Sequence, residues 1–593
     1  MHTTLPPLRV LPVAHLPLVR GVIDQLGLEE VIDARLPKHV LAKVSDAECV
    51  KAMLLSILSG RQALWKQDLW LGKIDAELLL GEGVEAAAFH DTRLGVALDR
   101  LDEVGTDRIL GDVVTRYLAG RPADREGFSV HLDTSSVSVY GAYEDAPDPT
   151  PLHGYSKDKR PDLKQLIFGM SLHGSAGIPL TMSVAKGNTS DTVSNRDHLS
   201  KLAALLPERD RITVVADCKA VDAETLGQLH KAGFHLVSLV PNSHKVRGEM
   251  VSRAWTEHPE VDAWPVLESR PGDHKGDPPR LYRGHSYEQM AMIQVGQTDD
   301  EKPLLEGRRY RYLVVWSDVL AGKFDRGLPE RLQRESEDFL TQHERVFAKG
   351  FACEKDARSA ANRLLRKLEL HTVEQEVRCE EHRVKRDKPG RPRKGEDPQT
   401  ETLWFVEFSL EPDAEAIAAA RREASCFVLL SDWLHDAWDD RRVLAEYRHQ
   451  YIIEGHTGFR WLKGPAAVAP VFLNKPERIR ALGLILVLAL MIRNHIQYTL
   501  RQGMRERNRG VDHPFRKKED QKLTTEMAME WFGEIQSVLF ADPTGQWTRL
   551  APTLRPQALD LLGLLGLSPA LFLVPPRRLD PRNSTEIGEE PRD

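Results

Sequence analysis

The stretch Phe128–Gly141, FSVHLDTSSVSVYG, places apolar residues at alternate positions over much of its length, which is the period of a β-strand. Two further stretches of strand length follow it, LKQLIFGMSLHG (163–174) and GIPLTMSVAKGN (177–188), each bounded by Gly, Pro or Asn. The pattern then predicts four more elements: a helix over 193–205, a buried strand ITVVAD over 212–217, a helix near 223–232, and a strand FHLVSLVP over 234–241.

This order of elements predicts an α/β fold. Three strands in a meander, followed by helix, strand, helix and strand, is the order of an RNase H-like core with a mixed five-stranded sheet and helices. In such a sheet the strand 212–217 lies beside the strand that begins at Phe128. Asp133 and Asp217 lie on these two strands, so we expect them to face a shared point.

The positions of Asp133 and Asp217 suggest metal chemistry. Asp133 lies in mid-strand, where a buried carboxylate costs free energy unless a positive group compensates it. Neighbouring carboxylates raise each other's pKa, whereas a divalent cation between them holds both ionised, and oxygen ligands suit Mg²⁺ or Mn²⁺. With a third carboxylate, two metals can catalyse phosphodiester hydrolysis and strand transfer. The alternative is that each Asp only caps a turn or a following helix.

A chain of 593 residues is long enough for several domains. Helical spacing before residue 122 predicts an all-helical N-terminal domain that either binds DNA or only packs, and Ser45 and Asp46 are expected to start one of its helices. The predicted organisation is a helical N-terminal domain (1–125), the first part of the catalytic core (126–243), an inserted mostly β/α domain (244–420), the second part of the core (421–510), a helical C-terminal region (511–574) and a disordered tail (575–593).

Composition is that of an ordinary soluble protein, with 41% hydrophobic and 28% charged residues. The formal charge of -7 neither supports nor excludes nucleic acid, because basic residues can gather on one face. Five scattered cysteines without a CxxC pair indicate a reducing compartment and no structural zinc. The apolar run 481–492 is too short to span a bilayer and predicts a buried core helix, and the N-terminus lacks a secretory signal, so a cytoplasmic location is expected.

Several blocks resemble a known family, the bacterial insertion-sequence transposases of the DDE class that carry a long insertion before the third carboxylate. The resemblance covers most of the chain and is carried by five blocks: HLDTSSVSVYG around Asp133, HGYSKDKRPDLKQL (153–166), IPLTMSVAKGNTSD (178–191), VVADCKAV around Asp217, and YRHQYIIEGHTGFRWLKG (447–464). The resemblance implies an RNase H-like core, Mg²⁺ as the metal and transposon-end DNA as the substrate. It makes Asp133 and Asp217 the first two acids.

The resemblance also implies a helix that carries a Glu and ends in a sequence like FRxLK, with seven residues from Glu to Lys. Here Glu454 lies nine residues before Lys463, and the position in register is His456. Either the loop 455–458 (GHTG) absorbs two extra residues and Glu454 remains the third ligand, or the position has changed to His. We interpret Glu454 as the third carboxylate. His456 could instead coordinate metal or contact phosphate.

Basic residues near these acids are expected to contact DNA phosphates. They are Lys157, Lys159, Arg160 and Lys164 after the first strand, and Arg460 and Lys463, three residues apart on the third-carboxylate helix. The segment 385–394, KRDKPGRPRK, looks like an AT-hook, whose Arg391 and Arg393 would enter a narrow A·T minor groove, although it could also be a flexible charged linker. Trp316 and Trp404 could stack on an extruded base, but core packing is the simpler role.

The sequence thus predicts a cut-and-paste DNA transposase that binds double-stranded DNA, namely terminal inverted repeats and target DNA. We expect it to assemble as a homodimer or higher oligomer in a synaptic complex, to be nucleoid-associated in a bacterial cytoplasm and to have no membrane partner. Two alternatives are an RNase H-like nuclease that cuts without strand transfer, and a transposase-derived DNA-binding protein that has lost its catalytic acids. His456 in the expected register of Glu keeps the last alternative open.

Overall fold

The computed structural model describes residues 7–60, 62–121, 127–141, 143, 148–155, 160–207, 209–272, 277–298, 300–383, 400–464, 475–512 and 519–578. The chain forms two compact units. The first comprises Met1–Ser238, Met290–Arg308 and Ala445–Asp593, and the second comprises Leu239–Gln289 and Arg309–Leu444. The AT-hook-like segment 385–394 and nearly all of the predicted tail lie outside the described residues. The residue boundaries predicted for the domains stay predictions.

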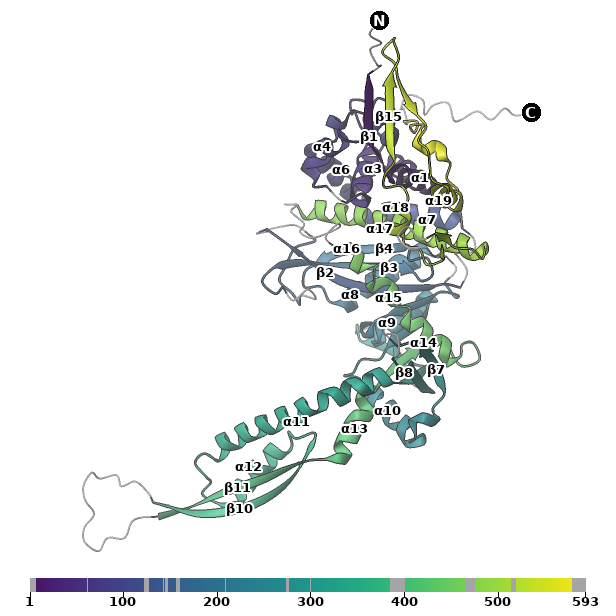
Figure 1. Cartoon of the computed structure of the whole chain (residues 1–593). Helices are drawn as coiled ribbons and strands as arrows, with labels where there is room; N and C mark the ends of the chain where they lie inside the picture. Colours follow the sequence, from purple (N-terminus) through teal and green to yellow (C-terminus); the bar gives the residue numbers. More distant parts are fainter. Residues whose placement is uncertain are drawn as a thin grey trace, which may run out of the picture. The chain divides into compact units, whose positions relative to one another are not determined.

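A mixed sheet forms the centre of the first unit (Figure 1). Within the described residues the sheet has nine strands, so the expectation of five was wrong. The strands of residues 129–239 are ordered β4-β3-β2-β5-β6; β2 pairs antiparallel with β3 and parallel with β5, and β5 pairs parallel with β6. This arrangement confirms the predicted mixed α/β architecture. The elements are β2 (Ser129–Val139), β3 (Lys164–His173), β4 (Pro179–Lys186), α8 (Asp191–Leu205), β5 (Thr213–Ala216), α9 (Ala223–Ala232) and β6 (His235–Leu239).

Helices cover both faces of this sheet, which explains why β3 is buried along almost its whole length. A Cβ added to Gly169 of β3 would meet His198 of α8, whereas the preceding residue, Phe168, touches Gly483 of α17 (Pro476–Glu506). Successive residues of a strand point to opposite faces. The two helices α8 and α17 therefore pack on opposite sides of the sheet.

Helix α17 is the core helix expected from the apolar run 481–492. By length and composition alone it could cross a membrane, but 94% of its most apolar window is buried inside the protein. It packs against β4 and against the N-terminal helices α3 (Asp46–Leu58) and α6 (Asp91–Val104). Two arginines near its start pair with α6: Arg478 with Asp99 at 2.7 Å and Arg480 with Asp102 at 2.5 Å. The prediction of a buried core helix is confirmed.

The N-terminal helices lie in the same compact unit as the sheet. Ser45 begins α3 with a capping box, in which its side chain accepts from the backbone N–H of Glu48 while the Glu48 carboxylate accepts from the backbone N–H of Ser45. The predicted helix start at Ser45 and Asp46 is therefore confirmed. The other helices of this region are α1 (Leu16–Leu26), α2 (Leu28–Arg35), α4 (Gln67–Leu71), α5 (Ala76–Leu80) and α7 (Thr106–Ala119).

Two expectations about the ends of the chain were wrong. The N-terminal region is not all helical, because β1 (Leu8–Pro12) precedes its helices, and the C-terminal region is not simply helical, because it contains β15 (Gln536–Ala541) and β16 (Trp547–Leu550). These three strands form one antiparallel sheet in the order β1-β15-β16. A strand of five residues whose partner lies more than 500 residues away has no local signal of that pairing. The remaining C-terminal elements are β13 (Val511–Asp512), β14 (Glu519–Asp520), α18 (Thr525–Glu530) and α19 (Pro556–Leu564).

The second unit contains most of the strands and helices between residues 239 and 444. Strand β12 (Cys426–Ser431) pairs antiparallel with β9 (Pro303–Ser317), and β7 (Val266–Arg270) pairs antiparallel with β8 (Arg280–Gln297). A long hairpin of β10 (His371–Arg383) and β11 (Thr400–Pro412) packs its apolar residues against helices α11 and α12. The helices of this unit are α10 (Lys245–Glu257), α11 (Asp318–Phe347), α12 (Glu354–Leu365) and α13 (Ala414–Ala424).

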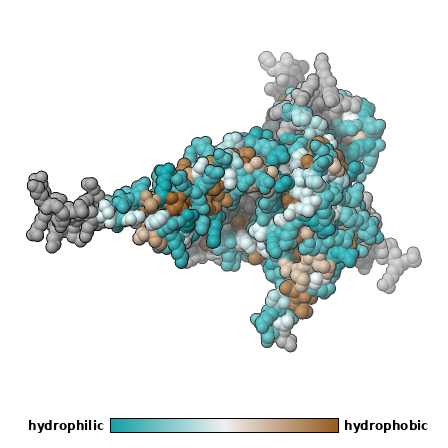
Figure 2. Space-filling model, turned by 90° about the horizontal axis from the view of Figure 1, so that it is seen from below, coloured by the Kyte–Doolittle hydropathy of each residue, from teal (hydrophilic) through white to brown (hydrophobic). Residues whose placement is uncertain are grey.

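The face of the molecule drawn in Figure 2 is mostly hydrophilic, and hydrophobic side chains form only small, separate areas on it. The apolar side chains of the sheet and of α17 lie in the interior instead, where Val215, Leu484 and Leu488 are fully buried. Burial of apolar surface is the main favourable contribution to folding.

The terminal sheet depends on a buried ion pair. Arg549 of β16 holds Asp75 with two hydrogen bonds of 2.7 and 2.9 Å, and the side chains are 12% and 3% exposed. Arg549→Ala should lower the free energy of unfolding by about 3–5 kcal/mol, because it leaves a buried carboxylate without its partner. Arg555→Ala is the matched control, because Arg555 and Glu534 are 58% and 85% exposed and such a pair contributes about 0–1 kcal/mol. Urea unfolding measures both, and equal losses would contradict the assignment.

Candidate active site

The parallel pairing of β2 with β5 aligns the first two predicted acids. Val130 lies opposite Val214, and His131 lies opposite Val215. Asp133 is two residues beyond His131, and Asp217 is two residues beyond Val215, so the same register brings both acids to one level at the end of β5. Both side chains are half-buried. The register therefore sets Asp133 and Asp217 at the same level on neighbouring strands.

The acid Asp217 begins a short turn. Its carboxylate accepts a hydrogen bond of 3.0 Å from the backbone N–H of Lys219, which caps the 3₁₀ turn Cys218–Ala220. The backbone carbonyl of Asp217 accepts from the hydroxyl of Ser238 on β6 at 2.7 Å. The capping role expected as the alternative for this residue is thus present. The cap uses one carboxylate oxygen of Asp217, and the other oxygen can still bind a metal ion.

The segment that carries Glu454 packs on the face of β2 where Asp133 lies. Helix α15 (Tyr451–Glu454) contacts β2 and β3. His131 shares its face of β2 with Asp133, since residues two apart on a strand point the same way. His131 in turn contacts Glu446 and His449, which come just before α15. The third predicted acid is therefore carried by a segment that covers the strand of the first.

Tyr447 links the second and third acids and was given no role from the sequence. Its pKa is raised to about 12, first by burial and then by the negative charges of Glu454 and Asp217. A phenol whose pKa responds to both carboxylates lies within electrostatic reach of both. Its hydroxyl stays protonated at neutral pH and can donate a hydrogen bond. Tyr447 is the first residue of the block 447–464, but the spacing of residues in the sequence gives no reason to select it as a site residue.

The loop between α15 and α16 (Phe459–Leu462) contains the two residues out of step with the family pattern. Glu454 ends α15, His456 lies in the loop, and both side chains are exposed. The loop is tied to α17, because Arg493 donates to the carbonyl of His456 at 3.1 Å and Asn494 donates to the carbonyl of Thr457 at 2.8 Å.

Glycines make this loop possible. A Cβ on Gly455 would lie 2.6 Å from the carbonyl oxygen of Tyr451, and a Cβ on Gly458 would lie 1.8 Å from that of Ile453. Only glycine fits such close backbone contacts without movement. The glycines of GHTG thus permit the break in the helix that would let Glu454 keep its position.

A fourth carboxylate, Asp191, lies near this site and was not selected from the sequence. It is the first residue of α8, and its carboxylate accepts a hydrogen bond from the hydroxyl of Thr134, the neighbour of Asp133. The pKa of the Cys218 thiol is raised by burial first, then by Asp217, with a smaller contribution from Asp191. In the sequence, the only indication of a role for Asp191 was its place at the end of the block 178–191.

The basic residues predicted to contact DNA are only partly described. Arg160 is exposed and holds Asp162 with hydrogen bonds of 2.8 and 2.7 Å, Lys164 begins β3, and Arg460 and Lys463 lie on and just after α16. Lys157, Lys159, Arg391 and Arg393 lie outside the described residues. The DNA contacts stay predictions. Of the two tryptophans, Trp404 packs against the core of the second unit, and Trp316 lies in β9 opposite Cys426.

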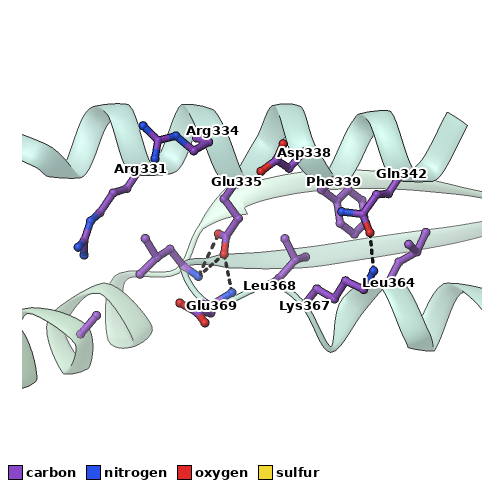
Figure 3. A pocket seen from close by; sticks show the side chains of 12 residues that line it. Arg331, Arg334, Glu335, Asp338, Phe339, Gln342, Leu364, Lys367, Leu368 and Glu369 are labelled. Carbon is purple, nitrogen blue, oxygen red and sulfur yellow. Dashed lines mark hydrogen bonds between the residues drawn. The ribbon is translucent and has the colours of Figure 1, made fainter. Parts of the chain in front are cut away.

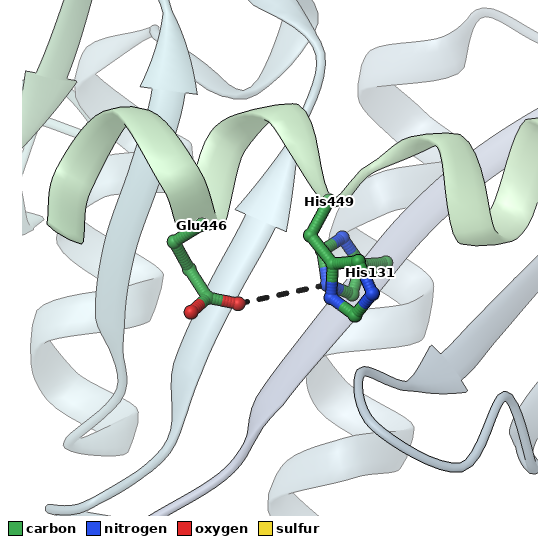
Figure 4. Close-up of side chains that lie close together, drawn as sticks. All are labelled: His131, Glu446 and His449. Atoms are coloured by element: carbon green, nitrogen blue, oxygen red, sulfur yellow. Dashed lines mark ion pairs between the residues drawn. The ribbon is translucent and has the colours of Figure 1, made fainter. Parts of the chain in front are cut away.

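Two histidines and a glutamate, His131, Glu446 and His449, form a cluster (Figure 4), and His131 lies two residues before Asp133 on β2. Nε2 of His131 lies 3.8 Å from Oε1 of Glu446, and the rings of His131 and His449 are 5.4 Å apart at an interplanar angle of 89°. Burial, then His449 and His173, lower the pKa of His131 to about 3. The imidazole is therefore neutral near pH 7, and the contact with Glu446 is not an ion pair.

A hollow of about 420 Å³ lies in the second unit, between α11 and the segment that follows α12 (Figure 3). Cations and anions are mixed along its wall, with Arg331, Arg334 and Lys367 beside Asp338 and Glu369. Its Glu335 accepts from the backbone N–H groups of Glu369 and Leu370 and contacts the ring of His371. Glu335 thus joins α11 to the segment that follows α12, which is a structural role. We therefore assign the hollow no catalytic role.

Gly458 provides a test of the loop geometry. Gly458→Ala should cost about 1–3 kcal/mol of unfolding free energy, because the new methyl group overlaps the carbonyl of Ile453 and the loop after Glu454 must move. Gly111→Ala in α7 is the control: open space surrounds this position, and Ala in a helix should gain about 0.5–1 kcal/mol. Urea unfolding gives both values. A Gly458→Ala protein as stable as the wild type would show that the loop differs from this description.

Comparisons with known proteins add little. A family model described as a domain of unknown function (DUF4277) matches residues 8–115, and no curated protein matches the chain. Among solved structures, a piggyBac transposase synaptic complex with hairpin DNA matches at 10% identity and a TM-score of 0.22, over 48% of this chain and 56% of that one. A pre-cleavage Mos1 transpososome matches at 10% identity and a TM-score of 0.14, over 34% of this chain and 61% of that one.

A Mos1 paired-end complex with the left transposon end matches at 12% identity and a TM-score of 0.13, over 34% of this chain and 60% of that one. The chain thus spans less than two thirds of the length of each of these solved proteins. Likeness at this level carries no argument about the fold or the activity of the chain.

Proposed function

We propose that this protein is a DNA transposase of the DDE class, which cleaves DNA at the ends of an insertion sequence and joins them to target DNA. The observation that carries the proposal is the register between β2 and β5. The β2–β5 register aligns Asp133 with Asp217, and the pKa of Tyr447 responds to both Asp217 and Glu454. Three carboxylates gathered at the end of β5 would be the donor set of a phosphoryl-transfer site.

The strands β2 to β6 support an RNase H-like core. The order β4-β3-β2-β5-β6, with an antiparallel meander followed by two parallel strands, is the arrangement that the sequence motifs led us to expect. The family resemblance of the blocks around Asp133, Asp217 and Glu454 points the same way. Fold alone does not determine activity, so the proposal rests on the acids.

The donor set fits Mg²⁺, with Mn²⁺ as the alternative. Asp133, Asp217 and Glu454 offer hard oxygen ligands, and all three side chains are at least partly accessible to solvent. The pKa of Tyr447 is raised first by burial and then by the charges of Glu454 and Asp217, and a bound cation would offset the second contribution. When bound, divalent metal would activate water or a 3′-hydroxyl and stabilise the leaving oxygen.

Contacts with DNA belong to the proposal too. Lys157, Lys159, Arg160 and Lys164, with Arg460 and Lys463, would neutralise phosphates near the acids, and Arg391 and Arg393 would enter a minor groove. Arg160 would first have to release Asp162. The partners would be terminal inverted repeats and target DNA, bound by a homodimer or higher oligomer at the bacterial nucleoid in the cytoplasm.

A second candidate function is DNA binding without catalysis. It is favoured by His456, which occupies the register where the family pattern has its Glu and which is exposed in the loop after α15. Against it, Glu454 is the residue whose charge reaches Tyr447 together with that of Asp217. An RNase H-like nuclease that only cuts shares the same acids, so only its products distinguish it.

Cleavage and joining test the proposal. Purified protein, Mg²⁺ and the DNA ends that flank its own gene should give cleaved ends and joined products with a target plasmid. Asp133→Asn, Asp217→Asn and Glu454→Gln should each lower cleavage on the order of 10²–10³-fold, because metal stabilisation of the transition state contributes several kcal/mol. Asp262→Asn is the control, because this carboxylate is 97% exposed and lies in the second unit.

The outcomes of this experiment distinguish the transposase from the nuclease and from the non-catalytic DNA-binding protein. Cleavage retained in Glu454→Gln but lost in His456→Ala would remove Glu454 from the site. Cleavage without joining would make the protein a nuclease. DNA binding without cleavage by the wild type would support the non-catalytic candidate.

A further inference from the structure

Beside the acids lies a second cluster that the proposed function does not use, formed by His131, Glu446 and His449 (Figure 4). One ligand atom from each residue can be chosen so that all three lie within 4.8 Å of one another. Atoms bound to one small cation lie closer than this, so only small side-chain movements are needed. We propose that this cluster binds one transition-metal ion, Zn²⁺ by preference, at a site separate from the three acids.

The backbone presents these residues in a form suited to coordination. Glu446 lies in α14 (Asp440–Arg448), and His449 continues its last turn, because its N–H donates to the carbonyls of Ala445 and Glu446. Residues three apart share a helix face, and a Glu-x-x-His pair of this spacing supplies metal ligands in helical metalloproteins. His131 is supplied by β2. The three ligands thus come from two rigid elements.

The burial of His131 supplies an independent indication. Its side chain is fully buried, and its Nδ1 has no hydrogen-bond partner among the described residues. Its Nε2 lies 3.2 Å from the hydroxyl of Ser129 and 3.8 Å from Oε1 of Glu446, so Nδ1 is the ring nitrogen that would gain a partner as a metal ligand, after a small movement of the ring. An unsatisfied buried nitrogen costs about 1–3 kcal/mol, and such groups are rare in folded proteins. Metal coordination would account for it, with Ser129 fixing the orientation of the ring.

The ligand chemistry favours a different metal from that of the acids. Two imidazoles and one carboxylate suit Zn²⁺ and its neighbours in the first transition row, whereas Mg²⁺ prefers oxygen alone. The site uses no cysteine, so it does not conflict with the scattered cysteines of the chain. Three protein ligands leave a fourth position for water.

The site would act as a clamp. His131 is two residues from Asp133, and His449 is five residues from Glu454. An ion held by both would fix the segment of the third acid to the strand of the first, which makes the three ligands positioning residues rather than catalytic ones. This consequence rests on the proposed function, but the binding of the metal does not.

The test measures metal binding in the absence of DNA. Full-length protein without a histidine tag is stripped with chelator, and Zn²⁺ is titrated in the presence of excess Mg²⁺ by calorimetry, with bound zinc counted by mass spectrometry after dialysis. Wild type should retain one zinc per chain. His449→Gln and Glu446→Gln should each weaken zinc binding at least about a hundredfold, because the loss of even a second-shell partner costs about 10–100-fold.

Controls separate the site from its neighbours and from misfolding. Asp217→Asn, which alters the acids, and His39→Ala, which removes an exposed imidazole, should both bind zinc like wild type. Without metal, the two ligand variants should have the wild-type circular dichroism spectrum, and zinc should raise the unfolding temperature of wild type only. With Co²⁺ instead of Zn²⁺, wild type should show a visible absorption band of tetrahedral cobalt that both ligand variants lose.

Two results would overturn the proposal. One is zinc binding by His449→Gln and Glu446→Gln that equals wild type, and the other is the absence of any tight zinc binding by wild type. Neither result depends on DNA cleavage. The proposal of a zinc site can therefore fail while the proposed transposase activity stands, and the reverse.

Discussion

The parallel pairing of β2 with β5 is the constraint on which the rest of the site depends. Side chains alternate along a strand, so a slip of one residue would turn every side chain of β2 to the other face. The register that sets His131 opposite Val215 therefore determines both where Asp133 meets Asp217 and which face carries them. Helices on both faces of the sheet hold this register, because neither face can be exposed without loss of buried apolar area.

The third acid reaches the sheet by a different route. Its segment follows the whole second unit in sequence, and it is placed by contacts with β2 and with α17 rather than by a strand ladder. Gly455 and Gly458 permit the break after α15, and Asn494 ties that break to the core. The buried helix α17 thus positions the loop 455–458, which directly follows Glu454, the residue that we interpret as the third ligand. The proposed zinc site would add a second tie between the same two elements.

Sequence patterns predicted the part of this structure that depends on local periodicity. The strands and helices between 128 and 241, the helix start at Ser45 and the core helix around 481–492 are present where apolar spacing and capping residues indicated them. The pairing of β1 with β15 was missed because it joins residues more than 500 apart. Asp191, Tyr447 and the cluster around His131 were missed because their contacts cross between elements, and periodicity does not say which side chains meet.

The central claim is that Asp133, Asp217 and Glu454 jointly bind divalent metal. Locating the bound metal in a crystal structure tests this claim most directly. Crystals of the protein with transposon-end DNA, grown in Mn²⁺ with the scissile bond blocked, would give an anomalous difference map for manganese. The account predicts a manganese peak with carboxylate oxygens of all three acids about 2.0–2.3 Å away. A peak bound by Asp133 and Asp217 with Glu454 turned away, or with His456 in its place, would contradict it.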